Sequence, residues 1–193
     1  IKISHPFFTE LSDQLSAYLL SFEESPIRAK ERAEGLQEHL DVYFDEEFWA
    51  EIGELITGSY NKGFDYMHGY KNSDDRLAFE YADGMGVVEV REKEASDNRK
   101  HILYWYVERI DKDKKAIIHI QDWTEEETYF YIQEGETGKI EIDKSAAVNP
   151  RPHVVYTDNA TGKRMGYSFG YIPFWRLDYN RKQISGLKPI KPI

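Results

Sequence analysis

The sequence predicts an α+β protein, in which N-terminal helices are followed by an antiparallel β meander. Two observations support this prediction. In the first third of the chain, apolar residues recur every three or four positions, the spacing of one buried helix face. From Gly63 onward the period is two, and short β-branched or aromatic runs are separated by Asn, Asp, Gly and Lys, as in hairpins. We therefore expect a helical part (1–60), an antiparallel β part (61–180) and an end segment (181–193).

The first two expected helices begin at Pro-containing start signals. One follows Ser4-His5-Pro6, and its buried face is predicted to consist of Phe8, Leu11, Leu15, Tyr18, Leu19 and Phe22. The other begins at Ser25-Pro26, since Ser favours the cap and Pro the first helical position. This second helix has Gly35 near its middle and a weaker apolar stripe of Ile27, Leu36, Leu40 and Tyr43.

A third helix is expected to begin at Asp45 and to end before Gly58. Carboxylates at its start suit the positive end of the helix dipole. Its apolar stripe is Phe48, Ile52, Leu55 and Ile56, which predicts one buried face. We interpret its acidic cluster as a solvated helix face, consisting of Asp45, Glu46, Glu47, Glu51 and Glu54.

The pattern of the remaining sequence predicts strands and turns. The expected strands are GFDYMHGY, RLAFEYA, GVVEVRE, HILYWYVERI, KAIIHIQDW, ETYFYIQEG and GKIEID, with turns at RIDKDKKA and EGETGK. Residues 146–166 contain several Pro and Gly residues and are therefore expected to form a long loop. Residues 171–175 form a last apolar run before the tail.

Composition excludes several classes of protein. The 193 residues, 40% of them hydrophobic, are enough for one sizeable core or two small ones. The absence of cysteine excludes disulfides and thiol chemistry and removes the commonest ligand of zinc. No run approaches the roughly 18 apolar residues of a membrane span, and the start lacks the pattern of a signal peptide. The missing initiator Met and the abrupt end are expected of a piece of something longer.

Charge is distributed unevenly along the chain. The net charge of −10 argues against a generic nucleic-acid-binding domain, which usually has a basic surface. Residues 149–193 contain eight basic and two acidic residues, a net charge of +6, whereas residues 1–148 contain 17 basic and 33 acidic residues, a net charge of −16. Two interpretations stay open: a solvated charge bias, or a basic tail of one copy that lies on the acidic body of another.

A search for catalytic and cofactor motifs finds none. The histidines are scattered, and only His101 and His119, on neighbouring strands, could meet as a metal pair. EGETGK lacks the first Gly and the final Ser or Thr of a phosphate-binding loop and is interpreted as a turn. Gly84-Met85-Gly86 is too short for a dinucleotide fingerprint. Trp105 and Trp123 are expected in the core. We therefore predict no catalytic, cofactor-binding or metal-binding residues.

A metal-dependent nuclease or hydrolase of a mobile element is the alternative. Such an enzyme needs carboxylates that converge on one ion, and alternation along strands could bring some together. The candidate ligands are Glu80, Asp83, Glu89 and Glu92. No Lys or His is spaced convincingly to complete the site.

Three motifs follow one another in a characteristic order. The helix led by acidic residues ends in SYNKGFDYMHGY, which contains Asn61, Lys62, Gly63 and Tyr66. A polar turn, Asn-Pro-Arg-Pro-His, spans residues 149–153 within the segment VNPRPHVV. The last motif is Gly-x-Ile-Pro-Phe at residues 170–174, followed by Ser-x-Leu at 185–187. In this order and spacing the motifs resemble the portal proteins of tailed phages that infect Gram-positive bacteria, and the resemblance covers nearly the whole chain.

The resemblance implies a structural protein and not an enzyme. Portal proteins form the ring at the vertex of the phage head, through which DNA is packaged and ejected. The implied partners are further copies of the subunit in a dodecameric ring, together with terminase, scaffold, capsid and connector proteins. DNA contacts are expected mainly outside this part of the protein, and no cofactor or membrane is implied. The implied location is the virion, with assembly in the host cytoplasm.

The resemblance also assigns this chain to the wing of the portal, outside the channel. Residues 181–193 would then be the lead-in to a stem, although the sequence Lys-Pro-Ile-Lys-Pro is richer in Pro than that pattern requires. A head-to-tail ring needs two complementary surfaces on each subunit. We therefore expect Arg176, Arg181 and Lys182 at a subunit interface, facing acidic residues of the adjacent subunit.

Overall fold

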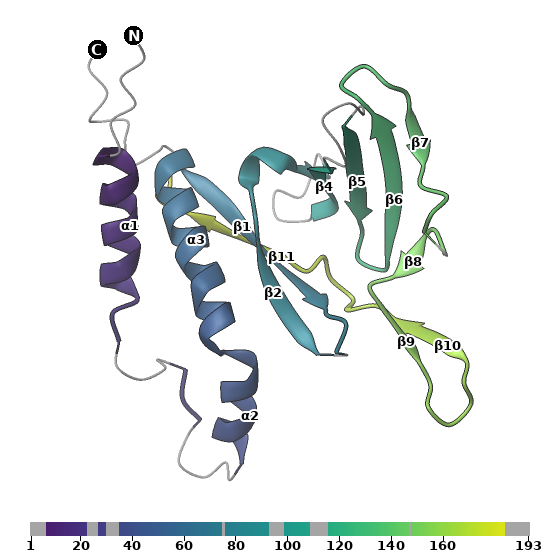
Figure 1. Cartoon of the computed structure of the whole chain (residues 1–193), viewed down its shortest axis with the longest axis horizontal. Helices are drawn as coiled ribbons and strands as arrows, with labels where there is room; N and C mark the ends of the chain where they lie inside the picture. Colours follow the sequence, from purple (N-terminus) through teal and green to yellow (C-terminus); the bar gives the residue numbers. More distant parts are fainter. Residues whose placement is uncertain are drawn as a thin grey trace. The chain divides into compact units, whose positions relative to one another are not determined.

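The computed structural model confirms the α+β class (Figure 1). It describes residues 7–22, 27–29, 35–74, 76–92, 99–108, 116–146 and 148–183. The chain forms two compact units: unit 1 comprises Ile1–Gly84 and Trp175–Ile193, and unit 2 comprises Met85–Phe174. In the described ranges, three helices in unit 1 precede the strands, which pair antiparallel.

Unit 1 consists of helices packed on a small sheet. Its helices are α1 (Phe7–Leu19), α2 (Leu36–Tyr43) and α3 (Glu46–Lys62). The three-stranded sheet has the order β11-β1-β2, from β11 (Phe174–Asp178), β1 (Phe64–Lys71) and β2 (Leu77–Ala82). Helix α3 contacts β1, β2 and α1, and it lies between α1 and the sheet (Figure 1).

Helix α3 begins where the sequence predicted and ends later. The Asp45 carboxylate accepts a hydrogen bond from the Phe48 amide at 3.0 Å, which makes Asp45 the N-cap. The helix does not end before Gly58 but continues to Lys62. It ends there because Gly63 adopts a left-handed conformation with φ 105° and donates its amide to the Ser59 carbonyl at 2.7 Å.

The predictions for α1 and α2 were wrong in part. Among the described side chains of α1, Ser12 and Ser16 are buried. Of the predicted face, Leu11 and Leu15 are half-buried, Tyr18 is 78% exposed, and the side chain of Phe8 lies outside those described. Small side chains are buried because α1 approaches α3 closely, and the Ser16 hydroxyl donates to the Gly53 carbonyl at 3.1 Å. Ser25-Pro26 lies outside the described residues, and residues 27–29 are not helical. Helix α2 begins only after Gly35, whose φ of 75° is not helical.

Unit 2 is built on the predicted meander. Its main sheet has the order β3-β4-β5-β6-β7, with β8 paired to β6. The strands are β3 (Val87–Arg91), β4 (Arg99–Glu108), β5 (Ile117–Trp123), β6 (Glu127–Glu134), β7 (Ile140–Ile142) and β8 (Arg151–Pro152). The short 3₁₀ helix η1 (Gly84–Gly86) precedes β3, and EGETGK forms the turn between β6 and β7.

The expected loop at residues 146–166 contains strands instead. Besides β8, it includes most of a hairpin of β9 (Val154–Thr157) and β10 (Arg164–Tyr167). The short β-branched and aromatic run VVYT was therefore a strand signal that the neighbouring Pro and Gly residues obscured.

One face of the main sheet carries the core of unit 2. Val87, Ile102 and Trp123 are buried there, and the Phe174 ring lies 5.7 Å from Trp123. The prediction of a core position is thus confirmed for Trp123. It is wrong for Trp105, which is 40% exposed on the opposite face.

Candidate interaction sites

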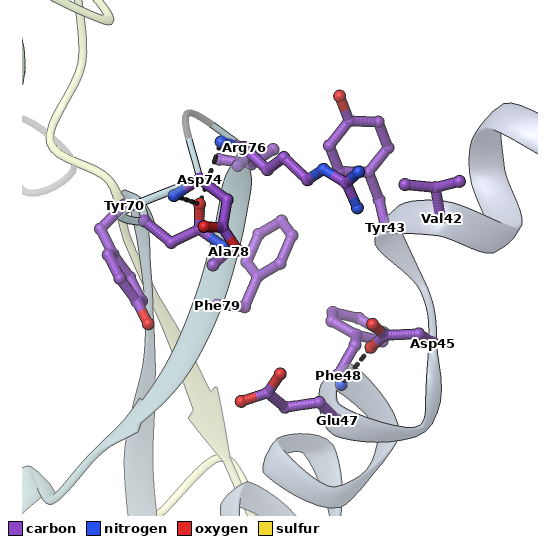
Figure 2. A pocket seen from close by; sticks show the side chains of 12 residues that line it. Val42, Tyr43, Asp45, Glu47, Phe48, Tyr70, Asp74, Arg76, Ala78 and Phe79 are labelled. Atoms are coloured by element: carbon purple, nitrogen blue, oxygen red, sulfur yellow. Dashed lines mark hydrogen bonds between the residues drawn. The ribbon is translucent and has the colours of Figure 1, made fainter. Parts of the chain in front are cut away.

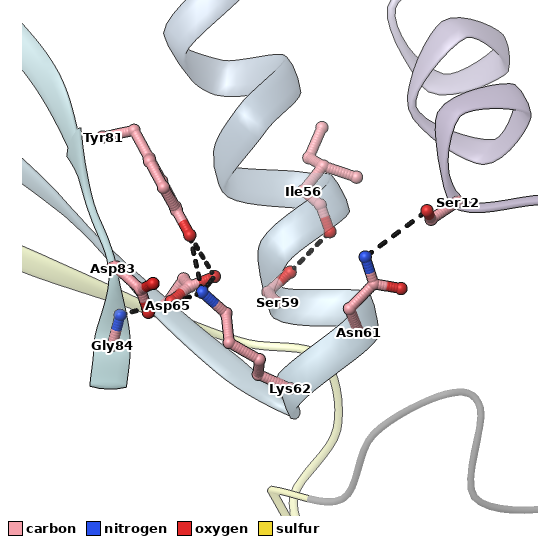
Figure 3. A network of polar contacts seen from close by, with 9 residues as sticks. All are labelled: Ser12, Ile56, Ser59, Asn61, Lys62, Asp65, Tyr81, Asp83 and Gly84. Carbon is pink, nitrogen blue, oxygen red and sulfur yellow. Dashed lines mark hydrogen bonds and ion pairs between the residues drawn. The ribbon is translucent and has the colours of Figure 1, made fainter. Parts of the chain in front are cut away.

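A buried polar network joins α3 to the sheet of unit 1 (Figure 3). The Lys62 ammonium lies 2.8 Å from an Asp65 carboxylate oxygen, and the Asp65 side chain is fully buried. The ammonium also donates to the Tyr81 hydroxyl at 2.6 Å and to the Asp83 carboxylate at 2.8 Å. One cation therefore connects the end of α3, the start of β1 and the end of β2.

The Asp65 carboxylate is held from the other side as well. Its Oδ1 accepts a hydrogen bond from the Gly84 amide at 2.5 Å, and its Oδ2 accepts one from the Tyr81 hydroxyl at 3.1 Å. Gly58 of α3 provides the space, because a Cβ at this position would lie only 1.9 Å from Oδ2. Gly58 thus allows the helix backbone to approach a buried charge.

The network favours the charged form of Lys62. Burial alone would lower the pKa of Lys62, but hydrogen bonds to Asp65, Asp83 and Tyr81 outweigh burial and raise this pKa above its ordinary value. Burial raises the pKa of Tyr81 to about 12, although its hydrogen bond from Lys62 acts in the opposite direction. The Tyr81 hydroxyl therefore stays protonated at neutral pH and donates to Asp65.

The Asn-Lys-Gly-Phe-Asp-Tyr segment has structural roles in this network. The Asn61 amide donates to the Ser12 hydroxyl at 3.4 Å, Gly63 caps α3, and Tyr66 is 2% exposed in the core. The sequence identified Lys62 but not its partners Asp65, Tyr81 and Asp83, because their proximity depends on how β2 pairs with β1.

A cavity of about 270 Å³ lies between the α2–α3 junction and the β1–β2 hairpin (Figure 2). Aromatic rings form part of its wall, with Phe48 and Phe79 5.2 Å apart. Its charged lining residues are Asp45, Glu47, Asp74 and Arg76. Such a lining suits a basic or polar group. Among the described residues that line it there is no Ser, Thr, Cys, His or Lys, so this lining offers no hydroxyl or thiol nucleophile paired with a His base.

Two carboxylates near this cavity have identifiable structural functions. Asp45 caps α3, and a Glu51 carboxylate oxygen accepts a hydrogen bond from the Tyr81 amide. Burial, together with Glu80, Glu47 and Glu51, raises the pKa of Tyr70. The acidic helix is thus not only a solvated face, because Glu51 connects it to β2.

The three predicted interface residues lie on β11 and in the turn after it. Arg176 is partly buried within unit 1: its Nε donates to Asp178 at 2.8 Å, and its guanidinium lies 4.2 Å above the Phe64 ring. Its Nη2 has no hydrogen-bond partner in the part of the chain that the structure describes. Arg181 and Lys182 are exposed. Their part in an interface stays a prediction, and residues 184–193 of the tail lie outside the described ranges.

The four carboxylates of the alternative function each contact a His, Lys or Arg side chain. In unit 1, Glu80 lies 2.8 Å from His68, and Asp83 contacts Lys62. In unit 2, Glu89 pairs with Arg91, and Glu92 lies 3.2 Å from Lys100. Within the described ranges, no three His, Cys, Asp or Glu residues are grouped as a metal site requires.

The two histidines on neighbouring strands do not meet. His119 pairs with Tyr106, whereas His101 pairs with Val90, and the strand register places the two rings on opposite faces of the sheet. Instead, His101 lies 2.8 Å from Asp122, and His119 lies 2.6 Å from Glu108.

Comparison with known families matches the chain over residues 1–193 to the family described as phage portal protein, SPP1 Gp6-like. No curated protein matches the sequence. None of the helices in the described ranges combines the length and apolar character that crossing a membrane requires. The family match spans every motif on which the resemblance rested. The chain therefore belongs to the SPP1 Gp6-like phage portal proteins.

Proposed function

We propose that this chain is the wing of a subunit of the portal ring, the structure at the vertex of the phage head through which DNA is packaged and ejected. The observation that supports this function is the family match over all 193 residues. The wing is a structural part of the ring, made of unit 1 and unit 2, with residues 181–193 leading toward the stem.

The proposed role involves no catalysis. Glu80, Asp83, Glu89 and Glu92, the candidate ligands of a nuclease, are each engaged with a basic or imidazole side chain. The described lining of the unit 1 cavity has no Ser, Thr or Cys nucleophile with a His base beside it. Both observations favour the structural role over the alternative of a metal-dependent nuclease or hydrolase.

The proposed partners are further copies of the subunit in a closed ring, together with the terminase, scaffold, capsid and connector proteins of the head vertex. The protein would then be found in the virion, after assembly in the host cytoplasm. DNA passes through the ring and makes its contacts mainly outside these residues. Arg176, Arg181 and Lys182 are proposed to face acidic residues of the adjacent subunit.

Native mass spectrometry and electron microscopy of the full-length protein test the proposal. The expected result is a closed ring of identical subunits. A stable monomer without rings, under conditions that permit assembly, would overturn it. The same preparation should not cleave DNA or hydrolyse nucleotides with Mg²⁺. Metal-dependent cleavage that disappears in Glu89→Gln or Glu92→Gln would favour the nuclease.

A further inference from the structure

One face of the unit 2 sheet is apolar and exposed. Residues that pair directly across antiparallel strands share a face, and Trp105 pairs with Ile120, Ile120 with Tyr131, and Tyr131 with Ile142. We call this surface the apolar sheet face. Its most exposed members are 40% to 60% exposed and consist of Val88, Val90, Trp105, Val107, Ile140 and Ile142.

This distribution differs from that in most antiparallel sheets. Such sheets usually turn polar residues to water on the face that no core covers. Here both faces are apolar: the covered face holds Val87, Ile102 and Trp123, and the exposed face is also largely aliphatic and aromatic, with the polar pair of His101 and Asp122 among its residues. Exposed apolar patches of this kind mark contacts with other proteins.

The size of the face indicates what kind of contact it makes. Strands lie about 4.8 Å apart, and alternate residues about 7 Å apart, so five strands and three rows cover roughly 400 Å². A stable two-protein interface buries about 800 Å² on each partner. The apolar sheet face therefore suits one contact among several in an assembly better than it suits an independent dimer.

A second exposed apolar element lies in the same unit. The β9–β10 hairpin, which we call the aromatic arm, extends from the rest of unit 2 (Figure 1). It exposes Tyr156 by 37%, Met165 by 46% and Tyr167 by 53%. Its base is attached where Pro152 packs on Gly166 and the Ser168 hydroxyl bonds to the Glu126 carbonyl. Isolated two-stranded hairpins are marginally stable in water, so a covering surface would stabilise the arm.

The two surfaces are complementary in charge. The arm and the strand before it, residues 151–167, contain Arg151, Lys163 and Arg164 against the single acidic residue Asp158. The sheet segment 117–142 contains one basic residue, Lys139, and seven acidic residues. Asp122 and Glu127 share the apolar sheet face, and Glu125, Glu126 and Glu136 lie in the turns at its ends, whereas Glu134 and Glu141 pair with Ile117 and Ile132 on the opposite face. Opposite charges around apolar centres favour the correct orientation of two partners.

We propose that the aromatic arm of one subunit lies on the apolar sheet face of the next subunit in the ring, an inference that rests on the proposed function. The two surfaces differ, so their contact is head-to-tail, and head-to-tail contacts form a ring when the rotation between successive subunits closes. Both surfaces belong to unit 2. Each subunit therefore donates an arm to one neighbour and receives an arm from the other.

Cysteine cross-linking of the full-length protein tests this contact, since residues 1–193 contain no cysteine of their own. Subunits with Met165→Cys are co-assembled with subunits carrying Trp105→Cys or Ile142→Cys, and the rings are oxidised. We expect covalent dimers in at least one mixture and none in rings of the Met165→Cys subunit alone. Rings in which no mixture forms dimers would overturn the inference, as would dimers of the Met165→Cys subunit alone, which indicate a symmetric contact.

A charge in the arm should weaken the contact. Met165→Glu is expected to slow ring assembly at least several-fold, whereas the matched control Met85→Glu, at a side chain that is 72% exposed outside both surfaces, should assemble like wild type. Assembly of Met165→Glu at the wild-type rate would contradict the contact. If the wild-type protein formed no ring, the proposed function would fail instead, so the two failures are distinguishable.

Discussion

At the scale of single residues, the Lys62–Asp65 pair gives unit 1 a charge interaction with a fully buried partner. Asp65 is fully buried, and a buried carboxylate without a cation is costly. The surface pair of Lys100 and Glu92 differs, since both side chains are more than 40% exposed. Exposed pairs of that kind contribute only about 0 to 1 kcal/mol.

Lys62→Met should therefore lower the free energy of unfolding by about 3 kcal/mol, because it leaves the Asp65 charge buried without its cation. Urea unfolding of the chain measures this loss. Lys100→Met serves as the matched control and should change the free energy of unfolding by less than about 1 kcal/mol. Equal losses in the free energy of unfolding would show that the buried pair stabilises the protein no more than the exposed pair does.

Alkaline pH should weaken unit 1 through the same network. An unfolded Tyr loses its proton near pH 10, whereas Tyr81 in the folded protein has a pKa of about 12. Between these values the folded state binds more protons, so stability falls as pH rises from about 10 to about 12. The raised pKa of Lys62 acts in the same direction.

Urea midpoints measured between pH 9 and pH 11 test this dependence. Tyr81→Phe removes the hydroxyl that titrates. The urea midpoint of this variant should therefore fall less steeply with rising pH than the midpoint of wild type. Tyr18→Phe, at a residue that is 78% exposed, should keep the wild-type slope. If the urea midpoints of wild type and Tyr81→Phe fell equally with pH, Tyr81 would not be a source of the alkaline loss of stability.

The sequence alone did not predict this network, and Asp83 stood out only as a candidate metal ligand. Lys62 stood out within a motif, but Asp65 becomes important only because Gly58 lets it approach α3 and because Tyr81 reaches it from β2. Those contacts depend on strand register and helix packing, which the local pattern does not contain. The cap at Asp45 was predictable, since it involves only neighbouring residues.

At the scale of elements, two glycines inside α3 should respond oppositely to the same change. Gly to Ala inside a helix normally stabilises it by about 1 kcal/mol. At Gly53 the new Cβ would lie 3.4 Å from the Ser16 hydroxyl, an ordinary contact, so Gly53→Ala should be neutral or stabilising. At Gly58 it would collide with the Asp65 carboxylate, so Gly58→Ala should lower the melting temperature. Stabilisation by both substitutions would show that Asp65 is not held against the helix.

Elements were predictable where local chemistry decides them. The start of α3 and the strands of the meander follow from caps and from period-two patterns. The buried face of α1 was not predictable, because its close packing on α3 selects Ser12 and Ser16 over the larger Tyr18. The aromatic arm was also missed, since Pro and Gly residues around VVYT favoured a loop.

At the scale of the whole molecule, the uneven charge of the chain should affect assembly. Arg181 and Lys182 are exposed in the basic segment, whereas Arg176 is engaged with Asp178 in its own unit. Arg181→Glu combined with Lys182→Glu should therefore slow ring assembly of the full-length protein, most strongly at low salt, where screening is weakest. Light scattering follows the rate. Wild-type rates at low salt would show that this segment is only a solvated linker.

Above all, we propose that these residues form the wing of a portal ring. A cryo-electron microscopy map of the assembled full-length protein tests it most directly, because unit 1 and unit 2 can each be fitted into the density separately. We expect a closed ring in which both units lie outside the channel and the aromatic arm contacts the neighbouring subunit. Density that places either unit on the channel wall, or particles that are not rings, would contradict it.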